Sequence, residues 1–144
     1  MIEILEVMKV VTLGVFLLTE GVRDFKMRRI SMISVVVFAA IGIMMQLPQI
    51  KENCISILGG ILIGIIFIGL AKLTKEKIGY GDGWVLVVTG IYIGFYGNMS
   101  LLALSLFIAS VVSIILLLCK KVGRKTELPF VAFMMPGYLF WVMM

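Results

Sequence analysis

The stretch ISILGGILIGIIFIGLAKL, residues Ile55–Leu73, decides the class of fold that we expect for this chain. Apart from Ser56, its residues are apolar or glycine up to Lys72, the first charged side chain. A helix needs about 20 consecutive apolar residues to cross the hydrocarbon core of a bilayer. A membrane β-strand would instead alternate apolar with polar residues. The stretch therefore predicts a transmembrane helix.

The composition of the whole chain agrees with this interpretation. Of its 144 residues, 62% are hydrophobic and 15% are charged, and the mean hydropathy is +1.18. Soluble domains contain about 45–50% apolar and about 25% charged residues. Since a chain of this length cannot hide so much apolar surface in one core, we exclude a soluble globular domain and a disordered chain. The composition predicts an integral membrane protein.

The residue types also limit the chemistry. The chain has no histidine and only two cysteines, Cys54 and Cys119. This excludes an imidazole base, a histidine-ligated metal and a cysteine-based zinc site. We therefore expect no metal and no cofactor. Any catalysis must use the remaining carboxylates, lysines, hydroxyls or thiols.

The apolar runs predict an all-α, six-transmembrane-helix bundle that forms a single domain over residues 1–144. No repeat or long linker divides the chain. Two small-xxx-small glycine pairs, Gly60 with Gly64 and Gly90 with Gly94, predict close helix packing within the bundle. The expected spans are about Ile4–Thr19, Ile30–Leu47, Ile55–Leu73, Trp84–Tyr96, Leu101–Cys119 and Pro129–Met144.

The basic residues predict the orientation of this bundle. All except Lys9 and Lys51 follow the first, third or fifth span, and cytoplasmic loops carry an excess of lysine and arginine. Both termini should therefore lie outside and these three loops in the cytoplasm. The net charge of +5 then reflects topology and contact with anionic lipid, and we expect no nucleic-acid partner. The loop residues are Arg23, Lys26, Arg28, Arg29, Lys72, Lys75, Lys77, Lys120, Lys121, Arg124 and Lys125.

Four further side chains lie near span ends. Cys54 is expected at the outer end of the third span and Cys119 at the inner end of the fifth, too far apart for a disulfide. Glu6 and Lys9 lie one helical turn apart and are expected to pair with each other or to reach the interface.

The only two aspartates, Asp24 and Asp82, are the candidate catalytic residues. Each has an ordinary alternative: Asp24 as a loop carboxylate beside arginines, and Asp82 as the N-cap of a glycine turn. Both are expected at the same membrane boundary, however. An aspartyl hydrolase needs two carboxyls close together, one ionised to take a proton from water and one protonated to donate.

The residues around these aspartates resemble the motifs of a known family. Gly-Tyr-Gly-Asp, residues 79–82, resembles the Gly-x-Gly-Asp signature of intramembrane aspartyl proteases. Asp24 with the following Arg-Arg-Ile, residues 28–30, resembles the first catalytic motif of type IV prepilin peptidases, and residues 79–83 resemble the second. Leu-Pro-Phe-Val-Ala-Phe, residues 128–133, is similar to their Pro-Phe segment. The resemblance extends from about residue 4 to the end of the chain.

The resemblance implies a membrane aspartic endopeptidase in the short, peptidase-only form, without the Cys-x-x-Cys segment linked to N-methylation. Its partners would be prepilin or pseudopilin precursors, serving pili or protein secretion, whose short basic leaders it removes at the cytoplasmic face of the cell membrane. Asp24 and Asp82 would activate a water without a covalent intermediate. Gly79, Gly81 and Gly83 would let the substrate backbone approach, and the loop with Asp24 would be free to move.

Two other functions remain open from the sequence. An ion- or proton-coupled transporter also uses buried carboxylates, although these usually lie near the bilayer midplane. A non-catalytic pilus or secretion assembly factor could share the same fold.

Overall fold

The computed structural model describes residues 1–75, 79–121, 123 and 127–144, and this part of the chain is helical with no strand. The predictions made for Lys77, Arg124 and Lys125 therefore lie outside the described residues. The elements are α1 (Ile2–Met27), α2 (Met32–Gln46), the 3-10 helix η1 (Leu47–Gln49), α3 (Ile50–Leu73), α4 (Tyr80–Leu118) and α5 (Phe130–Met143).

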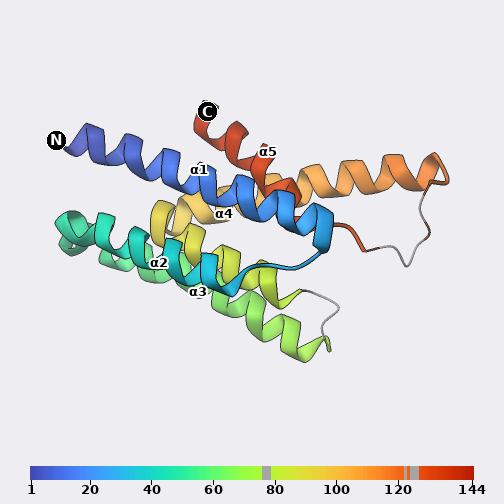
Figure 1. Cartoon of the computed structure of the whole chain (residues 1–144), viewed down its shortest axis with the longest axis horizontal. Helices are drawn as coiled ribbons and strands as arrows, with labels where there is room; N and C mark the ends of the chain where they lie inside the picture. Colours follow the sequence, from blue (N-terminus) through green and yellow to red (C-terminus); the bar gives the residue numbers. More distant parts are fainter. Residues whose placement is uncertain (76–78, 122, 124–126) are drawn as a thin grey trace.

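Helix α4 is interrupted at Gly94, where the chain reverses direction (Figure 1). Gly94 has φ 69° and ψ −168°, a conformation that L-residues rarely adopt. Asn98 Nδ2 donates to the carbonyl of Leu86 at 2.9 Å, whereas residues this far apart in a straight helix would be separated by roughly 18 Å. The predicted break between Tyr96 and Leu101 was therefore placed too late in the chain.

Polar side chains from neighbouring helices satisfy the backbone at this reversal. Gln46 Nε2 donates to the carbonyls of Ile91 and Tyr92, at 2.8 and 3.1 Å. The amide of Phe95 donates to Ser56 Oγ at 3.2 Å. These three backbone groups therefore keep a hydrogen-bond partner where the helix is broken.

Close glycine contacts join α3 to α4. A Cβ built on Gly60 would lie 2.6 Å from the carbonyl oxygen of Gly90, and one built on Gly64 would lie 2.5 Å from the backbone nitrogen of Val87. Only glycine permits this approach of two backbones. The packing predicted for the glycine pairs is confirmed.

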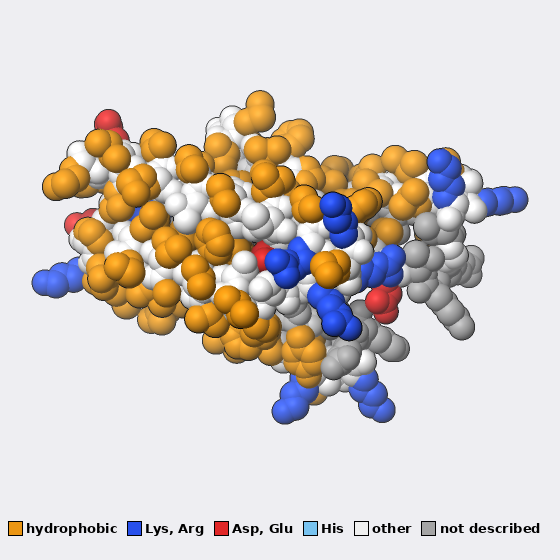
Figure 2. Space-filling model, in the orientation of Figure 1, with side chains coloured by type: hydrophobic (Ala, Val, Ile, Leu, Met, Phe, Trp, Pro, Cys, Tyr) orange, Lys and Arg blue, Asp and Glu red, His pale blue; other side chains and the backbone are white. Residues whose placement is uncertain are grey.

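The flanks of the bundle are apolar (Figure 2). Large hydrophobic side chains point outward, among them Ile33, which is 79% exposed. Within the described residues, two helical stretches, Met32–Leu73 and Tyr80–Leu118, are long and apolar enough to cross a membrane, and Phe130–Met143 is a shorter apolar helix. The stretch predicted as the first span, Ile4–Thr19, lies in α1 and is not one of the two.

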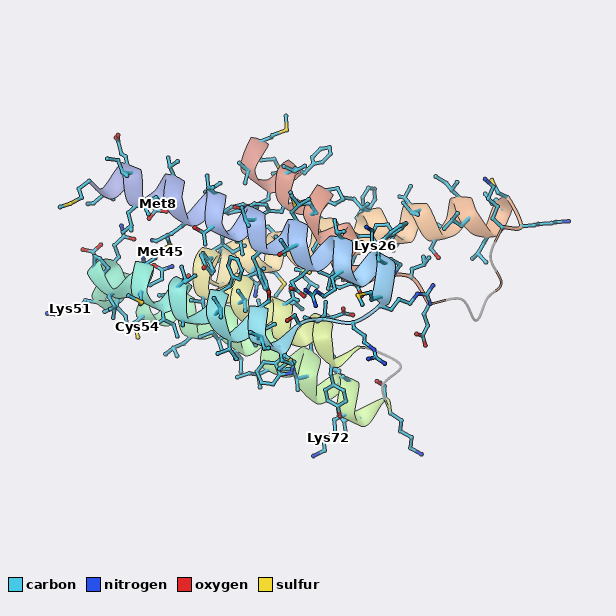
Figure 3. The ribbon with its side chains drawn as sticks, in the orientation of Figure 1. Met8, Lys26, Met45, Lys51, Cys54 and Lys72 are labelled. Atoms are coloured by element: carbon cyan, nitrogen blue, oxygen red, sulfur yellow. The ribbon has the colours of Figure 1, made fainter. Side chains whose placement is uncertain are left out.

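The helices run back and forth between two ends of the molecule. Figure 1 shows η1 at one end, and the α1–α2 linker and the C-terminal ends of α3 and α4 toward the other. In Figure 3, Lys51 and Cys54 lie at the η1 end, whereas Lys26 and Lys72 lie toward the opposite end. Basic side chains gather at that opposite end (Figure 2), which we call the basic end. Both cysteines are free and exposed.

Candidate active site

Asp24 lies on α1 at the basic end of the bundle. The prediction from the sequence that it lies in a loop is wrong. The helix continues to Met27 and ends at Arg28, whose left-handed backbone lets its amide donate to the Asp24 carbonyl at 2.9 Å. The Asp24 carboxylate is 7% exposed, and its Oδ2 accepts the amide of Val131 at 3.0 Å. The first amides of α5 have no partner within their own helix, so Asp24 ties α1 to the N-terminus of α5.

Asp82 lies in the first turn of α4. The N-cap is Gly79 and the helix begins at Tyr80, so Asp82 is the third helical residue and not the N-cap. The glycine-rich stretch predicted as a turn is thus helical from Tyr80 onward. A carboxylate in the first turn of a helix is stabilised by the unpaired amides and the helix dipole.

The three glycines around Asp82 have different surroundings. A Cβ on Gly81 would lie 2.5 Å from Ile30 Cγ1, and a Cβ on Gly83 would lie 2.5 Å from Ile68 Cγ1. Gly79 and Gly81 line the cavity beside Asp82, but Gly83 is buried against α3 and does not. The geometry thus favours close approach of a bound backbone at Gly79, whereas Gly81 packs against Ile30 and Gly83 against α3.

Asp24 and Asp82 face common space. Both line a cavity of about 420 Å³ and a second one of about 220 Å³, and Arg28 and Gly79 also line both. The larger cavity is completed by Arg29, Ile30, Met32, Tyr80, Gly81 and Trp84. The smaller one is completed by Glu127, Leu128, Pro129 and Phe130.

Burial shifts the protonation of both aspartates, which lie outside the predicted spans. Burial, together with the negative charge of Asp24, raises the pKa of Asp82 from 3.8 to about 7. Burial also raises the pKa of Asp24, helped by Glu20 and opposed by the amides of Val131 and Ala132 and by the charge of Arg28. Two such carboxyls can hold one proton between them near neutral pH, which is what acid–base catalysis on water requires.

The described residues contain no group of three acidic or cysteine side chains that could hold a metal ion. Arg28 and Arg29 line the same cavity as the two aspartates, and their positive charges disfavour a cation there.

Glu20 is a buried carboxyl at the same end that the sequence analysis did not single out. It is 0% exposed, its Oε2 accepts the amide of Ser31 at 3.0 Å, and its Oε1 has no partner in the described structure. Glu20 precedes Asp24 by one helical turn and so lies on the same face of α1. The four-residue spacing between Glu20 and Asp24 was the only feature of the sequence that could have indicated this buried carboxyl.

A polar cluster at the opposite end has a structural role. Lys9 is buried, and its Nζ donates to Glu6 at 2.9 Å, to Gln46 at 3.1 Å and to Gln49 at 2.9 Å. The pairing predicted for Glu6 and Lys9 is confirmed. All three ammonium protons have partners, so the cluster joins α1 to the α2–η1 turn.

Comparison with known proteins adds one match. A family model described as the type IV leader peptidase family matches residues 11–118, which include Asp24 and Asp82. No curated protein and no solved structure matches the chain.

Proposed function

The chain belongs to the type IV leader peptidase family, and from this we propose that it is a membrane aspartic endopeptidase that removes the short basic leader from prepilin or pseudopilin precursors. The observation that carries the proposal is the pair of aspartates on one cavity, both with a raised pKa. The family supports a peptidase, and the cavity supports these two residues as its catalytic pair.

In the proposed mechanism, Asp24 is the general base and Asp82 the general acid. The amide of Val131 and the charge of Arg28 favour ionised Asp24, whereas Asp82 keeps its proton to about pH 7. Asp24 takes a proton from water as the oxygen attacks the scissile carbonyl, and Asp82 donates its proton to the carbonyl oxygen. The gem-diol intermediate then collapses: Asp24 gives its proton to the leaving amine, the C–N bond breaks, and ionised Asp82 takes up a hydroxyl proton as the new carbonyl forms. No covalent intermediate forms.

The orientation follows from the basic end. Positively charged loops remain in the cytoplasm, so we place the α1–α2 linker and the start of α4 on that side and both termini outside. The helices then cross the membrane six times, with α4 contributing two spans that meet at Gly94. Asp24 and Asp82 lie at the cytoplasmic boundary, where the leader of a membrane-inserted precursor is accessible.

The two cavities suggest how a precursor would lie. A helical peptide bond is shielded by its own hydrogen bonds, so the segment to be cut must extend beside Asp82. Gly79 lines both cavities and has no side chain to block this approach, whereas Ile30 covers Gly81. Glu127 lines the smaller cavity and offers a negative charge to a basic leader.

Cleavage of a leader-bearing prepilin in membranes tests the proposal. Asp24→Asn and Asp82→Asn should each lower the rate by about 100-fold or more, because each removes one proton-transfer group. Cys119→Ser, at an exposed thiol, should cleave normally. Near-normal processing by both asparagine variants would exclude the mechanism and favour a transporter or an assembly factor.

A further inference from the structure

The buried carboxyl of Glu20 is not used by the proposed mechanism, although it lies one turn from Asp24. Burying a carboxyl without full hydrogen bonding is costly, so its retention calls for a reason. Its one bond, to the amide of Ser31, crosses from α1 to the start of α2. Glu20 thus joins α1 to the far end of the short linker that contains Arg28, Arg29 and Ile30.

This linker contacts the start of α4. Ile30 precedes Ser31, and its side chain fills the space over Gly81, where an added Cβ would lie 2.5 Å from Ile30 Cγ1. Gly81 in turn precedes Asp82. A continuous path therefore runs from Glu20 through the Ser31 amide and the Ile30–Gly81 contact to Asp82.

Asp24 is held separately by α5. Its carboxylate accepts the amide of Val131, which lies outside the linker, and its backbone carbonyl accepts the amide of Arg28. Two contacts thus affect how the aspartates lie relative to each other: one joins Asp24 to α5, and the other joins Glu20 through the linker to the first turn of α4.

We propose that Glu20 is a positioning residue that holds the α1–α2 linker against the start of α4 and thereby sets Asp82 opposite Asp24. The proposal rests on the proposed function for its catalytic consequence, but the contact that it describes can be measured without any substrate.

Three variants test the catalytic consequence. Glu20→Met keeps the length and loses the acceptor, and it should lower kcat by roughly 10- to 100-fold with KM little changed, because small displacements of catalytic groups have effects of this size. Glu20→Gln retains an acceptor oxygen for Ser31 and should stay within a few-fold of the native rate. Glu3→Gln, an exposed acid at the far end of α1, is the matched control and should be unchanged.

Disulfide cross-linking tests the position directly, in a protein with Cys54→Ser and Cys119→Ser. The Ile30→Cys and Gly81→Cys pair reports the linker contact, because a Cβ on Gly81 would lie 3.1 Å from Ile30 Cβ. The Gly59→Cys and Phe95→Cys pair has the same 3.1 Å separation at the α4 reversal and is the control. Adding Glu20→Met should slow cross-linking of the first pair and leave the second unchanged.

The outcomes separate the two proposals. Native cross-linking and native kcat in Glu20→Met would overturn the role of Glu20, and slower cross-linking of both pairs would overturn it too, since that indicates general loosening. If the native protein does not cleave prepilin, the proposed function fails, and the cross-linking alone decides whether Glu20 positions the linker.

Discussion

Asp24 and Asp82 lie at the same end of the bundle but in different environments, since Asp24 is buried and Asp82 is partly buried. Asp24 accepts a backbone amide and has Arg28 nearby, both of which favour its charged form. For Asp82, burial and the charge of Asp24 both raise the pKa and so favour the protonated form. Environments that separate the protonation of two carboxyls assign the acid and the base.

The pH dependence of cleavage should follow from this difference. Activity should fall as the pH rises above about 7, because Asp82 then loses the proton that it must donate. It should fall again at acidic pH, where Asp24 becomes protonated. Measuring kcat/KM against pH in detergent checks this, and a rate that stays constant from pH 6 to about pH 9 would contradict the assignment of Asp82 as the acid.

The raised pKa of Asp82 also predicts an effect on stability. The folded protein holds this proton more tightly than the unfolded chain, so the free energy of unfolding decreases as the pH rises from 3.8 to about 7. Asp82→Asn removes the buried charge and should therefore raise the melting temperature at pH 8. At pH 4 the gain should largely disappear. A lower melting temperature at pH 8 would show that charged Asp82 is stabilising.

At the level of elements, the α3–α4 contact depends on individual glycines. A Cβ on Gly90 would overlap the backbone of Gly60, whereas one on Gly69 in the same pair of helices meets nothing within 4 Å. The two positions are therefore a matched comparison between a packed and an exposed glycine.

Alanine substitution should lower the stability at Gly90 but not at Gly69. Gly90→Ala should lower the thermal stability of the purified protein, because α3 and α4 must separate. Gly69→Ala should leave it unchanged or raise it by at most about 1 kcal/mol, since alanine favours a helix. Equal melting temperatures for the two variants would contradict the close contact.

For the whole molecule, the two native thiols report the proposed orientation. Cys54 lies at the η1 end, and Cys119 follows α4 at the other end of its second helical segment. A membrane-impermeant maleimide should label Cys54 in right-side-out vesicles and Cys119 in inside-out vesicles. Cys54→Ser and Cys119→Ser identify each product. Labelling of both thiols from one side would contradict the six crossings.

Local patterns accounted for much of the architecture. The helical character, the approximate ends of α2, α3 and α5, the glycine contacts and the Glu6–Lys9 pair could all be predicted, because each depends on residues close in the chain or on apolar length. The end of α1 was missed because Asp24, Arg23 and Arg28 look like a loop when the partner of Asp24 is unknown. The reversal in α4 was displaced because it is stabilised by Gln46 and Ser56, which are distant in sequence.

The sequence by itself determined that this chain is helical and apolar enough for a membrane, and it indicated Asp24 and Asp82, because hydropathy and short motifs are properties of neighbouring residues. Only the tertiary structure decided that Asp24 binds the amide of Val131, that Glu20 is buried on Ser31, and that Gly83 faces α3. These features arise where separate helices meet, and burial and hydrogen bonding there depend on which backbone groups the fold brings within about 3 Å of a side chain.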